Sequence, residues 1–596
     1  MDVITAYSNN SVPDNWVPVS IIITNQGQPV SGEIIISSKK DDLLRENVTE
    51  IDYIIPVEIP AQSKKIFREL IYYRKDFFST LSIRLVSNDR VLFEEKLEVN
   101  RIYEKQKLLV VNDSFSGFGF LGNSGSGERA VFYQKVEYLP QDWTAYLGID
   151  LIILDKADYR LMTDKQIRAL KGWLESGNTI IISGRGTYYT YNNRLMEEIF
   201  PAEFIKKESM ELLQTKLTFW HIKADNYQLL KKTGDLPLAV GRRSGAGQVI
   251  FSLADFQDLE LNELYYLELI DSVRENNFLR FEFLSSMIED MHSSVSFHFP
   301  ERYQIALILL IFMGVIIYIL HLFLVRERLN LSLFLLVYFI FITVYSAALY
   351  AFIYKPVTRK NDIMFELAVV NLIPGSEQAV VDGYISFQDP GWEKISFTIR
   401  DDKGSLNIIP LSGNEYPAIY LGDDYTELRA ENNGSKIVTG FHSCYRARLP
   451  VYFTAVKENQ NIILEVNNKS RFFIDCLFIN YQGEWYSYKG LAADTVGRFT
   501  LSEEALNDKM PWYYWYRMNK ELIPDGVNGE LPVKVLQKID YELKELEKTT
   551  EEIHIVAVLF GDGFEAVNTG ESVNREFLAF LKTSVDLKQM NILRKE

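Results

Sequence analysis

The sequence predicts a multidomain fold, with a β-sandwich and a parallel α/β domain, then a two-helix transmembrane hairpin, then C-terminal β-rich domains. The chain has 596 residues, enough for roughly three to five domains. Short β-branched runs separated by turn residues predict the β-rich parts, and apolar strands around a capped helix predict the α/β domain. Two long uncharged stretches predict the hairpin. The predicted boundaries are 1–102 for the first β-sandwich, 103–255 for the α/β domain, 256–300 for a helical juxtamembrane segment, 301–356 for the hairpin, 357–500 for a second β-sandwich and 501–596 for a mixed α/β C-terminal region.

The first hundred residues have the pattern of antiparallel strands. Runs at 17–24, 32–37, 51–59 and 81–86 are short and rich in Ile and Val, and turn residues such as those around Gly27 separate them. No long helical pattern interrupts these runs, so a small sandwich fits best. Similar runs return from about residue 362 to 500, which predicts further sandwiches.

Near residue 105 the pattern changes to fully apolar strands. We expect strands at 107–112, 136–139, 149–155 and 179–183, and a closing β-hairpin over 238–252. Strands that are apolar on both faces are typical of a parallel sheet covered by helices. Thr163 and Gln166 form a T-x-x-Q capping box that marks the start of a helix, and Gly177 is placed to end that helix. Residues from about 257 to 290 read as an acidic helix.

The predicted membrane spans are 305–325 and 331–354. Each has 20 or more residues without Asp, Glu, Lys or Arg, long enough for a hydrocarbon core of about 30 Å. The connector at 326–330 is short, so both soluble parts should lie on one side of a cell membrane. Its two arginines favour a cytoplasmic connector and extracellular domains. The first residues show no signal peptide, so we interpret the chain as a processed form.

Composition excludes several classes of function. With 63 basic and 80 acidic residues the formal charge is −17, which is unsuited to nucleic acid. Two cysteines and six scattered histidines predict no metal site and no cofactor. Cys444 and Cys476 would pair as a disulfide in an oxidising compartment, or remain as buried free thiols; the sequence leaves both alternatives open.

The α/β segment resembles a known fold. Its order of strands, its capped helix and the run Ile180-Ile-Ile-Ser-Gly-Arg-Gly resemble the class I glutamine amidotransferase-like domain, which is flavodoxin-like. The whole arrangement is similar to a family of uncharacterised bacterial membrane proteins with an external β-sandwich and such a domain. Arg185 stands where that resemblance implies a nucleophilic cysteine, and no cysteine precedes Cys444. The resemblance therefore implies a non-catalytic relative.

A candidate pocket lies at the strand ends of this segment. A literal G-x-G-x-x-G occurs at Gly117, Gly119 and Gly122, a pattern that in dinucleotide-binding proteins lets phosphate approach the backbone. Here the first glycine comes five residues after Asn112 and no P-loop lysine follows, which favours a loop over the sheet edge. Asp113 and Arg185 both follow predicted strands, so we expect a ligand or partner pocket between them.

The sequence thus predicts a membrane-anchored envelope scaffold or binding protein rather than an enzyme. Expected partners are the lipid bilayer and other membrane or envelope proteins, with a saccharide as a further candidate and no nucleic acid. The alternatives are an envelope saccharide-binding protein or hydrolase that uses the Gly-rich loop and Arg185, and an accessory subunit of a transporter.

Overall fold

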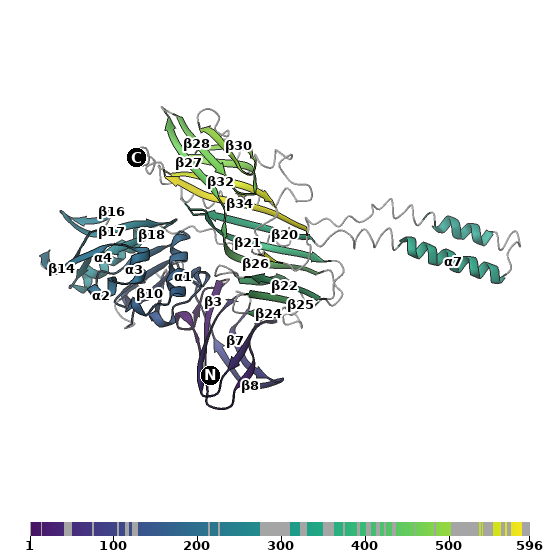
Figure 1. Ribbon diagram of the computed structural model, residues 1–596, viewed down its shortest axis with the longest axis horizontal. Helices are drawn as coiled ribbons and strands as arrows, with labels where there is room; N and C mark the ends of the chain where they lie inside the picture. Colours follow the sequence, from purple (N-terminus) through teal and green to yellow (C-terminus); the bar gives the residue numbers. More distant parts are fainter. Residues whose placement is uncertain are drawn as a thin grey trace.

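The computed structural model describes residues 2–273, 310–321, 331–349, 363–501, 536–539 and 552–586, with short gaps within these ranges. β-Strands dominate these residues, and their sheets join segments far apart in the sequence (Figure 1). Two eight-stranded sheets form what we call the β body. A seven-stranded sheet with its helices, within residues 106–271, forms what we call the mixed-sheet module.

The first sheet of the β body is built from the second half of the chain. Only one pair of its neighbours, β20 and β34, is parallel. In spatial order its strands are β23 (Asn407–Ser412), β26 (Ile437–Arg448), β21 (Gln378–Asp389), β20 (Ile363–Leu372), β34 (Asn574–Asp586), β32 (Glu552–Gly561), β29 (Phe473–Tyr481) and β30 (Glu484–Leu491).

The second sheet of the β body combines both halves of the chain. The junction is the parallel pair β24–β5, where Ile419 lies opposite Tyr53 and both are buried. The strand order is β33 (Val567–Asn568), β22 (Lys394–Arg400), β25 (Tyr425–Glu431), β24 (Ala418–Leu421), β5 (Glu50–Ile59), β4 (Val30–Lys40), β7 (Phe77–Ser87) and β8 (Arg90–Glu98).

Four small sheets complete the strands. They are β1 (Asp2–Thr5), β3 (Asn15–Asn25) and β6 (Ser63–Tyr73); β2 (Asn10–Ser11) with β9 (Asn100–Arg101); β14 (Glu203–Leu212), β15 (Thr215–Lys223) and β19 (Ala254–Phe256); and β27 (Val451–Glu458), β28 (Asn461–Asn468) and β31 (Thr495–Leu501). One continuous apolar core contains Ile21 of β3, Ile36 of β4, Val370 of β20 and Leu464 of β28. The β body is therefore held together by a core that no single segment could form.

The mixed-sheet module has five parallel strands followed by two antiparallel ones. Its order is β11 (Arg129–Gln134), β10 (Gln106–Val111), β12 (Leu151–Leu154), β13 (Thr179–Ile182), β18 (Gly247–Ser252), β17 (Leu236–Ser244) and β16 (Gln228–Thr233). Its helices are α1 (Asp164–Glu175), α2 (Tyr188–Tyr191), α3 (Arg194–Ile199) and α4 (Leu259–Asp271). Short 3-10 turns occur at η2 (Gly119–Leu121), η3 (Val136–Tyr138), η4 (Trp143–Tyr146) and η5 (Tyr159–Leu161), and η1 (Ala6–Asn9) precedes β2.

Helix α1 has the ends that the sequence predicts. Thr163 and Gln166 form the reciprocal capping box, and Gly177 takes a positive φ of 115° just after the helix. These local signals work because they involve neighbours in the chain. The predicted strand at 136–139 is wrong: residues 136–138 form the 3-10 turn η3, and the strand of this region is β11. The expected acidic helix is confirmed over α4; its remainder, 274–290, lies outside the described residues.

The predicted fold class as a whole is wrong. It expected separate β-sandwiches, but strands from residues 30–98 and 394–431 share one sheet. It expected a flavodoxin-like, amidotransferase-like domain, but the sheet of the module is mixed. Within the described residues, α1 is also the only α-helix of several turns that connects two neighbouring parallel strands, β12 and β13. The expected mixed α/β C-terminal region contributes β32 and β34 to the β body, while 502–535 and 540–551 lie outside the described residues.

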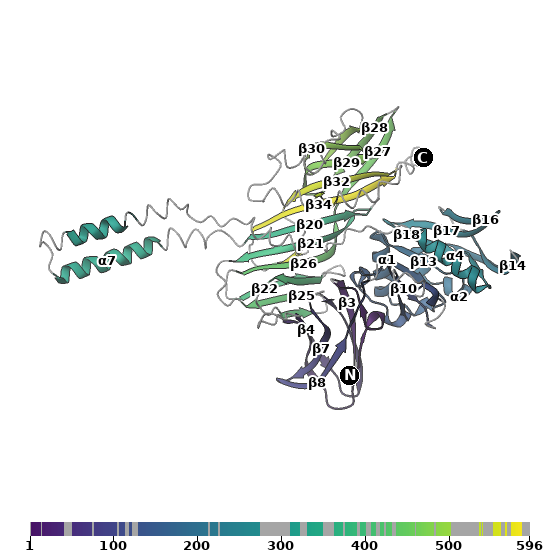
Figure 2. The same cartoon turned by 180° about the vertical axis from the view of Figure 1, so that it is seen from behind.

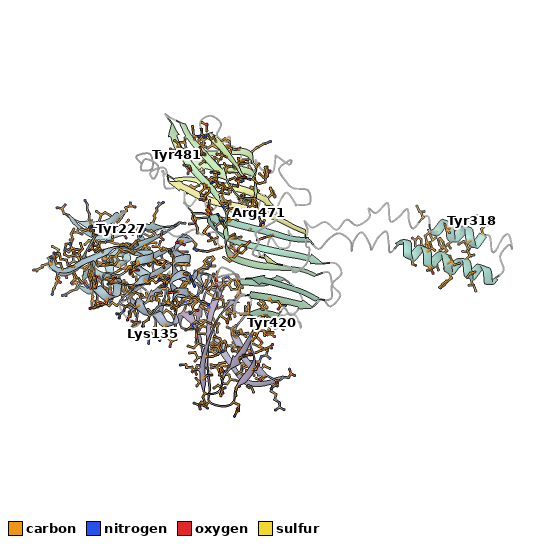
Figure 3. All side chains as sticks on the ribbon, viewed as in Figure 1. Lys135, Tyr227, Tyr318, Tyr420, Arg471 and Tyr481 are labelled. Atoms are coloured by element: carbon orange, nitrogen blue, oxygen red, sulfur yellow. The ribbon has the colours of Figure 1, made fainter. Side chains whose placement is uncertain are left out.

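The expected transmembrane hairpin, and with it the expected cell-membrane localisation, is also corrected. Within the part of the chain that the structure describes, no helix combines the length and the apolar character needed to cross a membrane. Residues 312–321 and α7 (Leu331–Leu349) are helical and lie side by side, away from the sheets (Figures 1 and 2). Phe312 stacks on Tyr345 with ring centroids 4.2 Å apart, and Tyr318 marks this helical pair in Figure 3. The rest of 305–325 and 331–354 lies outside the described residues.

One arginine connects the β body to the mixed-sheet module. Arg446 of β26 donates to the carbonyl oxygen of Gly172, lies 3.5 Å from the Glu175 carboxylate and sits 5.7 Å from the Trp143 ring centroid. Gly172 and Glu175 belong to the last turn of α1, and β13 begins a few residues later at Thr179. The contact is therefore at the amino ends of the parallel strands, and it leaves their carboxyl ends uncovered by the β body.

Replacing Arg446 should weaken this junction. We expect Arg446→Ala to lower the free energy of unfolding by about 2 kcal/mol, because the loss of hydrogen bonds to a charged group leaves the carbonyl of Gly172 and the carboxylate of Glu175 without this donor. Urea unfolding of the full chain measures the change. Arg498→Ala is the control, since Arg498 makes an exposed ion pair with Glu465, and such pairs contribute little. Equal losses for the two variants would contradict this role of Arg446.

Candidate functional site

Three neighbouring parallel strands end at one edge of the mixed-sheet module. β10, β12 and β13 are adjacent and parallel, so the residues that follow them share that edge. Asp113 follows β10, Asp155 and Lys156 follow β12, and Ser183 to Arg185 follow β13. In open α/β sheets the carboxyl edge is where ligands bind. We call this group of residues the strand-end site.

A buried carboxylate lies at the centre of the strand-end site. Ser183 Oγ donates to Asp155 Oδ1 over 2.7 Å, and Arg185 Nε lies 3.7 Å from the same oxygen. Only 1% of Asp155 is exposed. Its Oδ2 is buried and has no hydrogen-bond partner among the described residues. The Arg185 guanidinium also lies 5.2 Å from the ring centroid of Phe118, which places this residue of the Gly-rich loop over the site.

The turn that carries Arg185 is held rigidly. Trp220 Nε1 donates to the Gly184 carbonyl over 3.0 Å, and the Gly186 amide donates to Tyr191 Oη over 2.7 Å. A Cβ atom at Gly184 would overlap the backbone oxygen of Ser252. Glycine is therefore required at this close approach, and Arg185 is presented in one fixed position.

The hairpin side of the site adds charges of both signs. Lys207 of β14 donates from Nζ to the Gly186 carbonyl over 3.1 Å and lies 5.4 Å from the Trp220 ring centroid. Burial lowers the pKa of Lys207. Asp255 of β19 is half-buried, and burial raises the pKa of its carboxyl against the opposing charges of Arg185, Lys207 and Lys156. The Asp255 carboxylate has no hydrogen bond or ion pair among the described residues, and the Asp255 backbone pairs with Thr218 of β15.

Three of the predicted pocket residues, Asp113, Gly119 and Arg185, lie among the described residues. Asp113 is exposed, and its Oδ2 accepts from the Asp158 amide over 3.3 Å. Gly119 lies in η2, where an added Cβ would meet nothing within 4 Å, so the described surroundings do not require glycine there. Gly117 and Gly122 lie outside the described residues. Arg185 lies beside Asp155, and the pocket between Asp113 and Arg185 stays a prediction.

Sequence reasoning missed Asp155, Lys207 and Asp255. A signal for Asp155 was available, because it is the first charged residue after the apolar run that forms β12. Lys207 and Asp255 come from β14 and β19, which pair with β15 in a separate sheet. No local pattern connects those strands to the carboxyl edge of β13. Among the described residues, no three His, Cys, Asp or Glu side chains are grouped to hold a metal ion.

The two cysteines are buried free thiols, so the disulfide alternative is wrong for this structure. Cys444 packs in the core of the mixed-sheet module, whereas Cys476 lies in β29. Burial raises the pKa of both thiols, which makes them poor nucleophiles.

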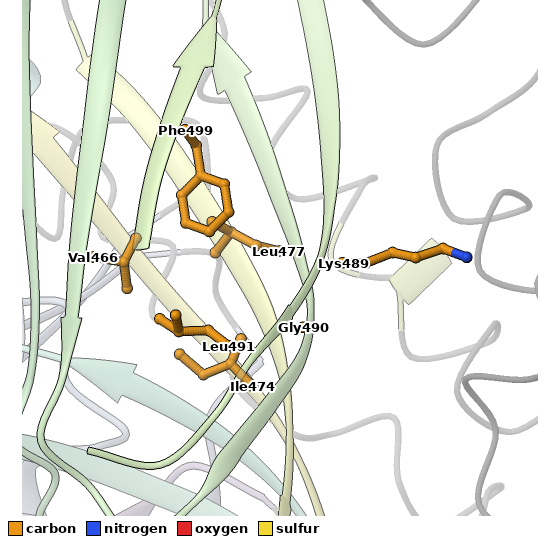
Figure 4. A pocket seen from close by; sticks show the side chains of 7 residues that line it. All are labelled: Val466, Ile474, Leu477, Lys489, Gly490, Leu491 and Phe499. Carbon is orange, nitrogen blue, oxygen red and sulfur yellow. The ribbon is translucent and has the colours of Figure 1, made fainter. Parts of the chain in front are cut away.

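A small apolar hollow lies between β28, β29, β30 and β31. Figure 4 shows apolar side chains facing it, while Lys489 points away. The apolar lining residues are Val466, Ile474, Leu477, Leu491 and Phe499. The hollow is too narrow for a water molecule, so we regard it as a packing gap.

Asp475 lies next to this gap at an irregularity of β29. The pairing with β32 shifts between Ile474 and Cys476, and Asp475 is the extra residue. Only 8% of Asp475 is exposed, and its Oδ2 has no hydrogen-bond partner among the described residues. Burial raises the pKa of its carboxyl to about 6, with the charge of Lys489 acting in the opposite direction.

Comparisons with known proteins identify no function. The profile of a domain of unknown function (DUF8726) matches residues 1–100, less than half of the chain. No curated protein matches. A catalytic mutant of Gan42B, a GH42 beta-galactosidase from G. stearothermophilus, is 10% identical with a TM-score of 0.20, over 59% of this chain and 41% of that one. A beta-galactosidase from Bacillus circulans sp. alkalophilus is 8% identical with a TM-score of 0.21, over 57% and 41%.

A yeast domain is similar to the chain at an equally low TM-score. The delta-COP-I mu-homology domain, complexed with a Dsl1 WxWxV peptide, is 8% identical with a TM-score of 0.20, over 37% of this chain and 96% of that one. The chain thus spans about two fifths of the length of the beta-galactosidases that it matches. At these TM-scores the likenesses carry no argument about fold or function.

A side chain at Gly184 should disturb the strand-end site. We expect Gly184→Ala to cost about 1–3 kcal/mol of unfolding free energy, because the new methyl group must displace backbone at Ser252. Thermal unfolding of the full chain measures it. Gly27→Ala is the matched control, since a Cβ there makes only an ordinary contact with Asn25. A Gly184 variant as stable as the Gly27 variant would show that the turn can move freely.

Stability should depend on pH through Asp475. Its pKa is raised to about 6 from 3.8, so the folded state binds the proton more tightly than the unfolded state. The group therefore destabilises the fold increasingly as pH rises from about 4 to about 6, and fully above that. We expect Asp475→Asn to raise the urea midpoint at pH 8 and to leave it nearly unchanged at pH 4. Asp494→Asn, in the exposed turn before β31, serves as control. A gain that is the same at both pH values would contradict this cause.

Proposed function

We propose that this chain is a binding protein that takes a polar small molecule at the strand-end site without converting it. The observation that carries the proposal is the convergence of Arg185, Lys207 and Asp255 from three separate elements, with Asp255 half-buried and without a hydrogen bond or ion pair to the described residues. Burying a charged group without a partner is costly. A polar ligand that donates to Asp255 and accepts from the two cations would offset that cost.

The arrangement favours binding over nucleophilic catalysis. A serine nucleophile needs an accessible hydroxyl beside a general base. Ser183 is 1% exposed, and its hydroxyl donates to the buried Asp155. His221, the histidine of this segment, is engaged with Glu208 at 2.7 Å on the exposed hairpin of β14 and β15. Ser183 and Asp155 therefore act as supports of the turn that presents Arg185.

The β body has the complementary role of a scaffold. It docks on the last turn of α1 through Arg446, at the amino ends of the parallel strands. α2 and β14, which border the strand-end site, lie on the side of the module away from the β body in both views (Figures 1 and 2). The binding surface is thus held in a fixed position and kept open.

Removing Arg185 should weaken binding. We expect one class of compound in a library of sugars, amino acids, organic acids and nucleotides to raise the melting temperature of the full chain. Arg185→Ala should weaken that binding at least tenfold, because a hydrogen bond to a charged group contributes about 1.5–3 kcal/mol. Arg90→Ala, at the exposed start of β8, should bind as the wild type does. Unchanged affinity in Arg185→Ala, or conversion of the compound into a product, would contradict the proposal.

A further inference from the structure

An exposed pair of aromatic rings borders the strand-end site. Tyr188 and Tyr189 are 49% and 69% exposed, and their rings meet edge to face with centroids 6.2 Å apart. They belong to α2, which follows directly after the turn that carries Arg185. The two tyrosines therefore offer an exposed aromatic surface on the helix that follows Arg185.

Tyr191 fixes these rings relative to the charged groups. It lies in the same short helix, is buried, and donates from Oη to the Ser183 carbonyl over 2.5 Å while it accepts from the Gly186 amide. Asp155 and Asp255 both act on Tyr191 electrostatically. The aromatic pair is therefore one helical turn away from a residue that contacts the centre of the site.

The charges around the site are balanced. The positive groups are Lys156, Arg185 and Lys207, and the negative groups are Asp113, Asp155 and Asp255. Electrostatic interactions connect Asp255 with all three cations and with Asp155, and connect Tyr159 with both Asp155 and Asp113. Three charges of each sign give no net preference for an anion or a cation. They do provide hydrogen-bond donors and acceptors side by side.

We propose that the ligand of the strand-end site is a neutral saccharide, with a sugar ring against Tyr188 and Tyr189 and hydroxyl groups between Asp255 and the cations Arg185 and Lys207. This inference rests on the proposed function and names its ligand class. A sugar hydroxyl donates and accepts at once, so it can donate to a carboxylate and accept from a lysine or arginine. The apolar face of a sugar ring buries well against an aromatic ring. The carboxylates of the site oppose the binding of a free anion.

The test is isothermal titration of the full chain with lactose, cellobiose, maltose and chitobiose. Sulfate and glycine, titrated in parallel, represent an anion and a zwitterion. The variants are Asp255→Asn and the double variant Tyr188→Ala with Tyr189→Ala. Controls are Asp235→Asn, in the exposed turn between β16 and β17, and Tyr103→Ala, which is 69% exposed and precedes β10 at the opposite edge of the sheet.

We expect at least one of the four sugars to bind with a stoichiometry of one. Its affinity should fall at least tenfold in Asp255→Asn and in the double tyrosine variant, and should be unchanged in both controls. Circular dichroism checks that each variant is folded. The proposal is overturned if no sugar binds, or if the sugar binds Asp255→Asn and the tyrosine variant as tightly as the wild type.

The outcomes separate this inference from the function on which it rests. Binding of sulfate or glycine alone, lost in Arg185→Ala, would overturn the saccharide and retain a binding role for the site. If no compound of the wider library binds in a manner that depends on Arg185, both proposals fail.

Discussion

The apolar core of the β body is the constraint on which the rest of the structure depends. Ile36 and Tyr53, from the first tenth of the chain, are buried with Val370 and Leu581 from its second half. Both halves of the chain contribute buried residues to this one core. The parallel pairing of Ile419 with Tyr53 makes the two halves one sheet. The mixed-sheet module lies between the two halves in the sequence. It therefore packs against a β body that forms only when distant strands pair.

The position of the mixed-sheet module on the β body explains why one edge of its sheet is available for binding. Arg446 of β26 contacts the last turn of α1, and β13 follows α1 after a few residues. This contact places the amino ends of the parallel strands against the β body. The carboxyl ends then present Asp155, Arg185 and their neighbours on the far side. A polar site is stable there because a closely packed turn, fixed by Gly184 and Trp220, holds each charge in place.

The charged side chains of the strand-end site differ in burial and in their partners. Asp155 is buried and engaged by Ser183, so it orders the turn. Asp255 is half-buried, and its carboxylate has no hydrogen bond or ion pair within the part of the chain that the structure describes; Lys207 donates to a carbonyl instead of a carboxylate. Charges that are not paired with one another retain the capacity to bind something else. Combined with Tyr188 and Tyr189, this gives the site both polar and apolar means of recognition.

Local features were determined by the sequence alone. The capping box of Thr163 and Gln166, the positive φ of Gly177 and the apolar strands β10, β12 and β13 follow from neighbours within a few residues. The position of Arg185 just after a predicted strand follows from the same apolar pattern. Only the tertiary structure decided which strands share a sheet, because residues 30–98 and 394–431 carry the same β pattern whether they pair or remain separate. It also decided that Lys207 and Asp255 meet Arg185, since they reach the site on strands of another sheet. Pairing between distant strands depends on the burial of a common core, and that energy is a property of the assembled chain, not of any segment.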